Sequence, residues 1–369
     1  MFVNLKAKLK KRIMNAVGQA ELVDYIKKLE DRLDNVNQNI KKHLDAIDDK
    51  LVSLSYDEFE SYMLALDFIA LESTNHCSYH CRMCPHDVMT RPKGFMANDD
   101  LCWVLENIAA YRPNYDKLIH LHGTGEAFLD KNLPEKVEFV RGKFPKAYIE
   151  IYTTLGVDYD ELLLDELSDK GLSSLLISCF GFDRSSYLST HGVDRFSNIM
   201  KKLPKLSEMV KKNKLHVIFS GPFGSTDENL IRSKMQERDI AIGDQIDKTK
   251  ILEFKSYIMS FGFAYYDTIL HNFCTMGFTP PMRAVKPCSV YSGAYRRSLW
   301  VDWDLKVRPC SIVTDQELIF GDLRKKSLRE IFYDTPWRHH HNALKTMKLK
   351  EDYPFCYLCQ QDSSVHLQK

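Results

Sequence analysis

The chain has 369 residues, of which 44% are hydrophobic, with a formal net charge of +1 and ten cysteines. This length predicts two or three domains, and the charge argues against a dedicated nucleic-acid-binding protein. The sequence contains no apolar run long enough to span a membrane, and its N-terminal stretch lacks the features of a secretory signal. We therefore expect a cytoplasmic protein whose cysteines stay reduced and serve metal or redox chemistry.

Residues 1–65 form a predicted helical segment. Apolar residues recur at heptad spacing over about 33 residues, which favours a coiled coil joining copies of the chain, with a helix packed on its own chain as the alternative. Near the start, lysines surround an apolar helical face in MFVNLKAKLKKRIM, which predicts either weak contact with an anionic membrane surface or a solvated helix start. The predicted seam comprises Leu22, Ile26, Leu29, Leu33, Val36, Ile40, His43, Ile47, Lys50 and Leu54.

In residues 66–275, apolar stretches typical of strands alternate with helical stretches. Residues 276–369 carry short strands, turns and four of the ten cysteines. The first pattern predicts an α/β fold with a parallel sheet, either open or a partial barrel. The second predicts a small α+β domain. The expected strands are Leu66–Glu72, Lys117–His122, Tyr148–Thr153, Ser174–Cys179, Leu215–Ser220 and Ala264–Leu270. The expected helices include Asp99–Tyr111, Tyr159–Lys170, Arg195–Lys212 and Asp227–Gln236.

The first cysteine group has the spacing C-x3-C-x2-C and consists of Cys77, Cys81 and Cys84. It follows directly on the first strand, at the end of a parallel sheet where catalysis is usually placed. Three thiolates on one loop can hold three irons of a [4Fe–4S] cluster and leave the fourth iron open for another ligand. A zinc site or three unrelated buried thiols are the alternatives.

This cysteine loop after a first strand resembles that of the radical S-adenosylmethionine (SAM) superfamily. The resemblance implies a partial (β/α)6 barrel of the TIM type, with SAM bound to the open iron. One electron from the cluster would then cleave SAM to methionine and a 5′-deoxyadenosyl radical, which abstracts a hydrogen atom from the substrate. Met83 stands where the family usually has an aromatic residue and is expected to pack beside the adenine of SAM. Tyr79 and His80 within the loop are expected to shield the cluster.

A second part of the resemblance lies at the ends of the next three strands. The sequence GTGE at residues 123–126 is similar to the family's glycine-glycine-glutamate motif. Glycines allow close approach of the backbone to a ligand, and the carboxylate of Glu126 would pair with the ammonium group of SAM. The resemblance thus implies a set of SAM-binding residues at Gly123, Thr124, Gly125, Glu126, Thr154 and Ser178.

The second cysteine group comprises Cys288, Cys310, Cys356 and Cys359, of which the last two form a CxxC pair. Four thiolates can complete a [4Fe–4S] cluster without an open iron, or a zinc site, and composition does not separate these two centres. The surrounding sequence resembles the SPASM extension of radical SAM enzymes. With four cysteines rather than seven or more, it is similar to the short form, called twitch, which implies one auxiliary [4Fe–4S] cluster.

The remaining chemistry falls at the end of residues 66–275, just past the sixth predicted strand. Cys274 is placed to donate a hydrogen atom in an epimerisation, and His271 to act as the base in a dehydrogenation, unless Cys274 only packs a loop. The resemblance to twitch enzymes implies oxidation or epimerisation of a small polar molecule, such as a sugar, a nucleotide-linked sugar or another glycan precursor. Flavodoxin or ferredoxin would supply electrons. Modification of a peptide or protein side chain is the alternative, and a non-catalytic electron-transfer protein is a third reading.

Overall fold

The computed structural model describes residues 24–38, 40, 58–81, 84–160, 162–221, 248–267, 298–310, 313, 318–346, 348, 352, 353 and 356. The chain divides into two compact units, Met1–Glu58 and Phe59–Lys369. In the first unit, residues 24–38 are helical, as the sequence predicts. The heptad residues Leu29, Leu33 and Val36 are 44–54% exposed, and their pairing in a coiled coil stays a prediction. The lysine-rich stretch near the start lies outside the described residues.

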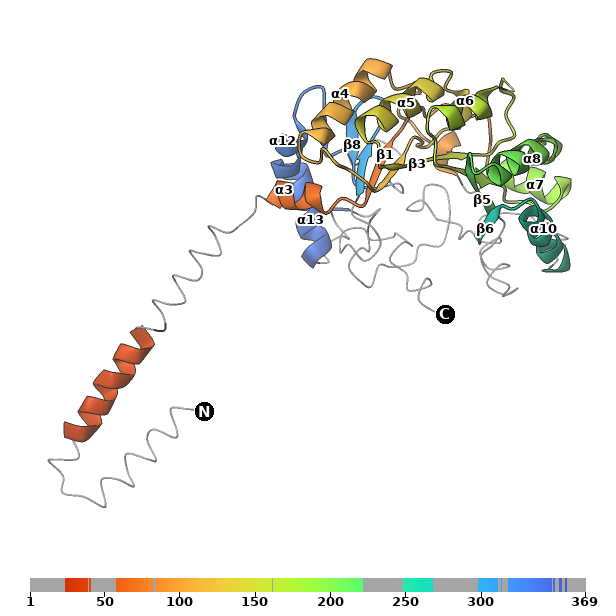
Figure 1. The fold of residues 1–369 in the computed structure, drawn as a ribbon. Helices are drawn as coiled ribbons and strands as arrows, with labels where there is room; N and C mark the ends of the chain where they lie inside the picture. Colours follow the sequence, from red (N-terminus) through yellow and green to blue (C-terminus); the bar gives the residue numbers. More distant parts are fainter. Residues whose placement is uncertain are drawn as a thin grey trace. The chain divides into compact units, whose positions relative to one another are not determined.

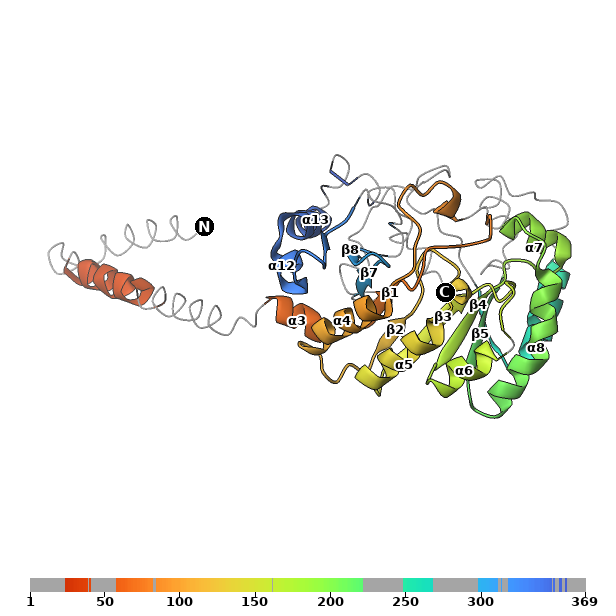
Figure 2. The same cartoon turned by 90° about the horizontal axis from the view of Figure 1, so that it is seen from above.

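The second unit is built on one sheet whose first six strands are parallel and neighbours in chain order. This confirms the predicted parallel sheet, and the third strand has the predicted bounds. Within the described part of the chain the sheet is open, with β6 and β9 at its edges. Figures 1 and 2 show the sheet in two views. The parallel strands are β1 (Phe68–Leu71), β2 (Leu118–His120), β3 (Tyr148–Thr153), β4 (Ser174–Ser178), β5 (His216–Gly221) and β6 (Ala264–Asp267).

Three further strands extend this sheet beyond β1. Strand β7 (Ser298–Val301) pairs parallel to β1, and β8 (Lys306–Arg308) and β9 (Gly321–Asp322) follow it antiparallel. The region predicted as a separate α+β domain therefore shares a continuous sheet with the predicted barrel. Its described helices are α12 (Leu328–Tyr333) and α13 (Thr335–Thr346), and α12 begins with a capping box in which Ser327 and Glu330 bond reciprocally.

Helices α4, α5 and α6 lie along one face of the sheet (Figure 1). In α4 the buried residues Leu101, Val104, Leu105 and Ile108 recur at helical spacing, so one stripe packs inward. The remaining bounds are α3 (Glu58–Leu64), η1 (Pro85–Asp87), α4 (Asn98–Ala109), η2 (Ala127–Leu129), α5 (Leu133–Lys143), α6 (Leu163–Asp169), α7 (Arg184–His191), α8 (Phe196–Lys211) and α10 (Lys248–Ser260). The predicted helix Asp227–Gln236 lies outside the described residues.

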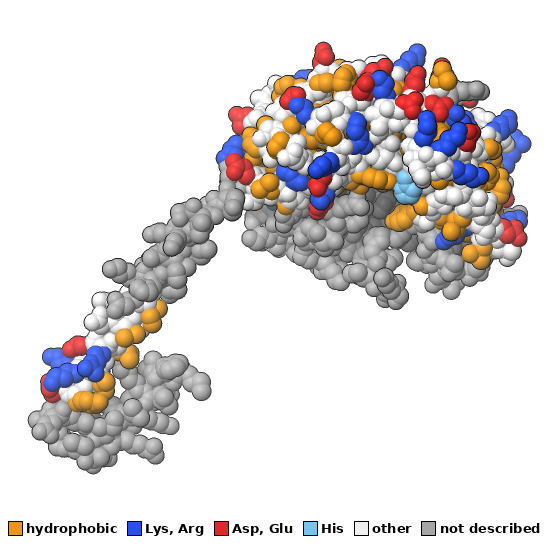
Figure 3. All heavy atoms as spheres, viewed as in Figure 1, with side chains coloured by type: hydrophobic (Ala, Val, Ile, Leu, Met, Phe, Trp, Pro, Cys, Tyr) orange, Lys and Arg blue, Asp and Glu red, His pale blue; other side chains and the backbone are white. Residues whose placement is uncertain are grey.

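The two faces of the sheet differ in character because successive strand residues point to opposite sides. Under the helices lie aliphatic residues such as Ile119, Ile151 and Leu175, all fully buried. The second face carries Phe68 and Trp300 in a small cluster of their own. On the outer, helix-covered surface, acidic and basic side chains are mixed (Figure 3). Among the described helices, none is both long enough and apolar enough to cross a membrane.

Candidate functional site

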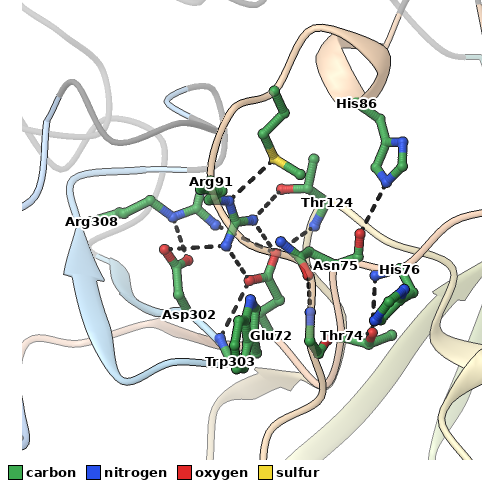
Figure 4. Close-up of polar contacts among 12 residues, drawn as sticks. Glu72, Thr74, Asn75, His76, His86, Arg91, Thr124, Asp302, Trp303 and Arg308 are labelled. Carbon is green, nitrogen blue, oxygen red and sulfur yellow. Dashed lines mark hydrogen bonds and ion pairs between the residues drawn. The ribbon is translucent and has the colours of Figure 1, made fainter.

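The loop that follows β1 carries the first cysteine group and is closed on itself by buried side chains. The amide of Asn75 donates to the carbonyl of Pro92 at 2.8 Å and accepts from the backbone N–H of Gly94 at 2.7 Å. At the far end, His86 Nε2 lies 3.0 Å from the carbonyl oxygen of Asn75 (Figure 4). Thr74 adds a further bond to Gly94. The loop therefore has a fixed beginning and end, with the cysteines between them.

The three cysteines of this loop are half-buried free thiols. Burial raises the pKa of Cys77 to about 12 and that of Cys84 to about 11, and it raises the pKa of Cys81 well above its ordinary value. Repulsion between neighbouring thiolates adds to the rise at Cys77 and Cys81. These thiols therefore need a nearby positive group to become the thiolates that ligate metal.

The donor set of this loop fits an iron–sulfur cluster. A cluster distributes its thiolates over several irons, so its ligands need not converge on one point. Three thiols without an oxygen ligand also form a soft donor set, as such clusters require.

The GTGE segment packs directly against the cysteine loop. A β-carbon on Gly125 would lie 2.5 Å from the carbonyl oxygen of His76, and the backbone N–H of Glu126 donates to this same oxygen at 2.8 Å. At Gly123 a β-carbon would lie 2.1 Å from the Cγ atom of Glu72. The glycines are thus needed for contact within the protein, in addition to any approach to a ligand.

Glu126 and Thr154, predicted separately as SAM-binding residues, are in direct contact. Glu126 is 2% exposed, and its Oε2 atom accepts from the backbone N–H of Thr154 at 2.8 Å and from its hydroxyl at 2.6 Å. Its Oε1 atom accepts from the hydroxyl of Thr153 at 2.5 Å and from the backbone N–H of Phe128 at 3.2 Å. The ends of β2 and β3 thereby hold this carboxylate in one orientation beside the cysteine loop.

The glycine at position 123 gives a test of this packing. Replacing Gly123 by alanine should lower the free energy of unfolding by about 1–3 kcal/mol, because the added methyl group overlaps a Glu72 side chain that cannot move away. The matched control is Gly142→Ala in α5, where an added β-carbon meets nothing within 4 Å. This control should raise stability by about 0.5–1 kcal/mol. Urea unfolding measures both, and equal effects would contradict the account.

The other residues predicted to lie near the cluster or SAM occupy different environments. Tyr79 is 1% exposed, and its hydroxyl lies 3.3 Å from the hydroxyl of Tyr187, with the guanidinium of Arg195 5.1 Å from its ring. It therefore anchors the cysteine loop to α7 and α8. Ser178 ends β4 and is half-buried. Met83 lies outside the described residues.

A buried cluster of four charged side chains joins this loop to the hairpin of β7 and β8. We call it the buried charge cluster: Glu72, Arg91, Asp302 and Arg308, each at most 5% exposed. Arg91 donates to both carboxylate oxygens of Glu72, at 2.6 and 2.5 Å, and Arg308 donates to Asp302 (Figure 4). Arg91 also bonds the hydroxyl of Thr124 in the GTGE segment. Two guanidinium and two carboxyl groups thus pair in the interior.

The acid dependence of stability should report on Glu72. Burial opposes ionisation, but hydrogen bonds from Arg91 and the charges of Arg91 and Arg308 outweigh it and hold the pKa of Glu72 at about 2. The unfolded chain therefore binds more protons than the folded chain between pH 4.5 and 2, and stability falls as the pH falls through this window. Burial raises the pKa of Asp302 to about 7, so Asp302 is already protonated there. Urea unfolding at pH 4.5 and 2.5 should show a steeper loss in the wild type than in Glu72→Gln; equal losses would contradict this assignment.

The second cysteine group is described in part. Cys310 follows β8 and Cys356 follows α13; both are half-buried free thiols packed against the core. His340 Nε2 lies 3.2 Å from Cys356 Sγ, and the neighbouring His339 and His341 bond elsewhere. Several predicted residues lie outside the described part of the chain, namely Cys288, Cys359, Cys274 and His271.

The second face of the sheet carries polar side chains that the sequence analysis does not single out. His120 Nε2 lies 2.9 Å from Glu150 Oε1, across neighbouring strands β2 and β3. His122 stacks on Tyr152 with ring centroids 4.0 Å apart. Burial lowers the pKa of His122 well below its ordinary value, so this imidazole is neutral. Side chains alternate between the two faces along a strand, so the spacing of two residues between His120 and His122, and between Glu150 and Tyr152, places each pair on one face.

No protein-family model and no curated protein matches this sequence. Among solved structures, the crystal structure of BtrN in complex with AdoMet (SAM) and 2-DOIA is similar, with a TM-score of 0.53 and 18% sequence identity, covering 80% of this chain and 92% of BtrN. The chain shares the fold of BtrN.

Two further solved structures show weaker similarity. Native anSMEcpe with bound AdoMet has a TM-score of 0.48 and 15% identity, over 80% of this chain and 89% of that protein. SuiB of Streptococcus suis, bound to its precursor peptide SuiA, has a TM-score of 0.49 and 13% identity, over 88% of this chain and 74% of SuiB.

Proposed function

We propose that the chain is a radical SAM enzyme in which Cys77, Cys81 and Cys84 hold a [4Fe–4S] cluster. The bound cluster would supply the electron that cleaves SAM to methionine and a 5′-deoxyadenosyl radical, which takes a hydrogen atom from the substrate. The observation that carries the proposal is the direct packing of the GTGE segment on the cysteine loop, at the carboxyl ends of β1 and β2.

The roles of the protein's own residues follow from this packing. Glu126 presents a carboxylate whose orientation is set by Thr153 and Thr154, and this charge is suited to receive an ammonium group. The backbone around Gly123 and Gly125 approaches the cysteine loop closely and leaves no room for larger side chains. The loop therefore keeps the three thiols and the carboxylate in one small region.

We propose a small polar substrate, such as a sugar or glycan precursor, which the enzyme oxidises or epimerises. The polar pairs on the second face of the sheet support this class, because His120 with Glu150 and His122 with Tyr152 offer hydrogen bonds and a stacking surface. The similarity in fold to BtrN, crystallised with the small molecule 2-DOIA, is in keeping with it. Modification of a peptide side chain remains the competing proposal.

Further parts of the proposal rest on the sequence. Cys288, Cys310, Cys356 and Cys359 would hold an auxiliary [4Fe–4S] cluster, and Cys274 or His271 would complete epimerisation or oxidation. A flavodoxin or ferredoxin would supply the electron in the cytoplasm.

The helix of residues 24–38 would join copies of the chain through a coiled coil. Light scattering of a chain without residues 1–60 tests this: the oligomer should be lost. An unchanged oligomeric mass argues against the coiled coil.

SAM binding gives the first test of the proposed function. Adding SAM to the anaerobically reconstituted and reduced protein should change the electron paramagnetic resonance (EPR) spectrum of the cluster, because SAM becomes a ligand of the open iron. Glu126→Gln, which keeps the size of the side chain but removes its charge, should need more SAM for the same change. The control is Glu138→Gln on the exposed face of α5, which should behave as wild type. A spectrum that never responds to SAM would contradict the proposal.

The substrate class needs a separate test. Candidate amino sugars, sugar nucleotides and peptides, each fully deuterated at carbon, are offered in turn to the reduced enzyme with SAM. A substrate that donates its hydrogen atom should place deuterium in 5′-deoxyadenosine. Labelling by a peptide and not by any sugar would favour the competing proposal.

A further inference from the structure

One imidazole approaches the first cysteine group from a distant part of the chain. His191 is the last residue of α7, fully buried, and its Nδ1 atom lies 3.2 Å from Cys81 Sγ. Its second ring nitrogen, Nε2, accepts a hydrogen bond from the backbone N–H of Phe180 at 3.0 Å. The two ring nitrogens therefore have different partners, and the partner of Nε2, a backbone N–H, can only donate.

These contacts determine where the proton of the ring lies. Nε2 needs a free lone pair to accept from a backbone N–H, so it carries no proton. A neutral imidazole with an unprotonated Nε2 carries its hydrogen on Nδ1, and this hydrogen is directed at the sulfur of Cys81. The geometry thus makes His191 a hydrogen-bond donor to a thiolate ligand.

The surrounding residues hold the ring in this position. Phe180 and Tyr187 stack on it, with ring centroids 5.3 and 4.2 Å away. The carbonyl oxygen of His191 accepts from the backbone N–H of His80, and Gly192, with a φ of 70°, ends the helix where a β-carbon would lie 2.5 Å from the carbonyl oxygen of His80. The end of α7 is therefore docked on the cysteine loop through both main chain and side chain.

We propose that His191 is a positioning residue that raises the reduction potential of the first cluster through an N–H···S bond to Cys81. This inference rests on the proposed function, since it requires the cluster. Hydrogen bonds to cluster sulfurs tune such potentials, because a donor stabilises the more negative, reduced state more than the oxidised state. The bond would thus make the one-electron reduction of this cluster easier.

The test is an EPR-monitored potential titration of His191→Phe, which keeps the stacking but removes the donor. We identify the signal of the first cluster as the one that disappears in Cys81→Ala. At a fixed potential, the ratio of reduced to oxidised cluster should fall about tenfold, which corresponds to ~59 mV for one electron. Thr190→Val is the matched control: Thr190 is as deeply buried in α7 but its hydroxyl bonds the carbonyl of Ser186. This control should keep the wild-type potential.

Two results separate this inference from the proposed function. A wild-type chain that takes up no iron would overturn the proposed function and the inference together. An unchanged potential in His191→Phe, with normal iron content, would overturn the inference alone.

A second measurement applies if His191→Phe binds no cluster. Loss of the hydrogen-bond donor to Cys81 destabilises its thiolate, which is the form that reacts with iodoacetamide. In the cluster-free proteins, iodoacetamide should therefore label Cys81 several-fold more slowly in His191→Phe than in Thr190→Val. Equal or faster labelling would overturn the inference.

Discussion

Replacing Arg91 by methionine should lower the free energy of unfolding by about 3–5 kcal/mol. The substitution leaves the carboxylate of Glu72, 2% exposed, without the guanidinium that donates to both of its oxygens. Arg308, at 3.8 Å from Glu72, compensates only in part, because its hydrogen bonds go to Asp302 and to the carbonyl of Val313. Urea unfolding at pH 7 measures the loss.

Two further variants show whether the loss comes from an unpaired buried charge. Lys214→Met removes an exposed cation that lies 3.4 Å from Asp169, and it should change stability by at most about 1 kcal/mol. The double variant Glu72→Gln, Arg91→Met should recover part of the loss, because no buried negative charge remains at position 72. If Arg91→Met proves no more harmful than Lys214→Met, the buried charge cluster does not have the role described here.

Replacing Cys81 by alanine should halve the iron content of the reconstituted protein, from about eight to about four irons per chain. Eight irons are expected from two four-iron clusters, and loss of one of three thiolates leaves the first cluster too weakly held to survive purification. Acid-labile sulfide should fall in parallel. Iron and sulfide assays on anaerobically purified protein measure both quantities.

The control for this variant is Cys102→Ala on α4, a half-buried cysteine with no proposed ligand role. It should keep about eight irons. Cys310→Ala should lose about four, from the auxiliary cluster, and keep the first. A wild-type protein with about four irons and one zinc would contradict the proposed auxiliary cluster, and an iron content unaffected by Cys81→Ala would contradict the first.

Much of the fold could be predicted because its signals are local. The strands of the parallel sheet are short apolar runs between helices, and β3 at Tyr148–Thr153 has the predicted bounds. The pairing of β7 with β1 could not be predicted in this way. It joins Phe68 to Ser298, and nothing in the sequence of either segment indicates which strand it pairs with. The region after residue 276 thus continues the sheet as well as carrying the second cysteine group.

In the candidate site, too, the local features could be predicted from the sequence and the long-range contacts could not. The spacing of Cys77, Cys81 and Cys84 lies within one loop and is readable in the sequence, as is the GTGE segment. Its supporting residues are not. Arg91 is an arginine in a polar stretch, and such residues are usually exposed, so nothing in the sequence marks it as buried. His191 is 110 residues from Cys81, and only the fold brings them together.

Reductive cleavage of SAM is the reaction on which the proposed function depends. The most direct measurement is release of 5′-deoxyadenosine, followed by mass spectrometry after anaerobic reduction of the reconstituted protein with dithionite in the presence of SAM. We expect release by the wild type and by Cys102→Ala, and none by Cys81→Ala. A fully reconstituted wild-type protein that releases no 5′-deoxyadenosine, or a Cys81→Ala variant that releases as much as the wild type, would contradict reductive cleavage of SAM at this cysteine loop.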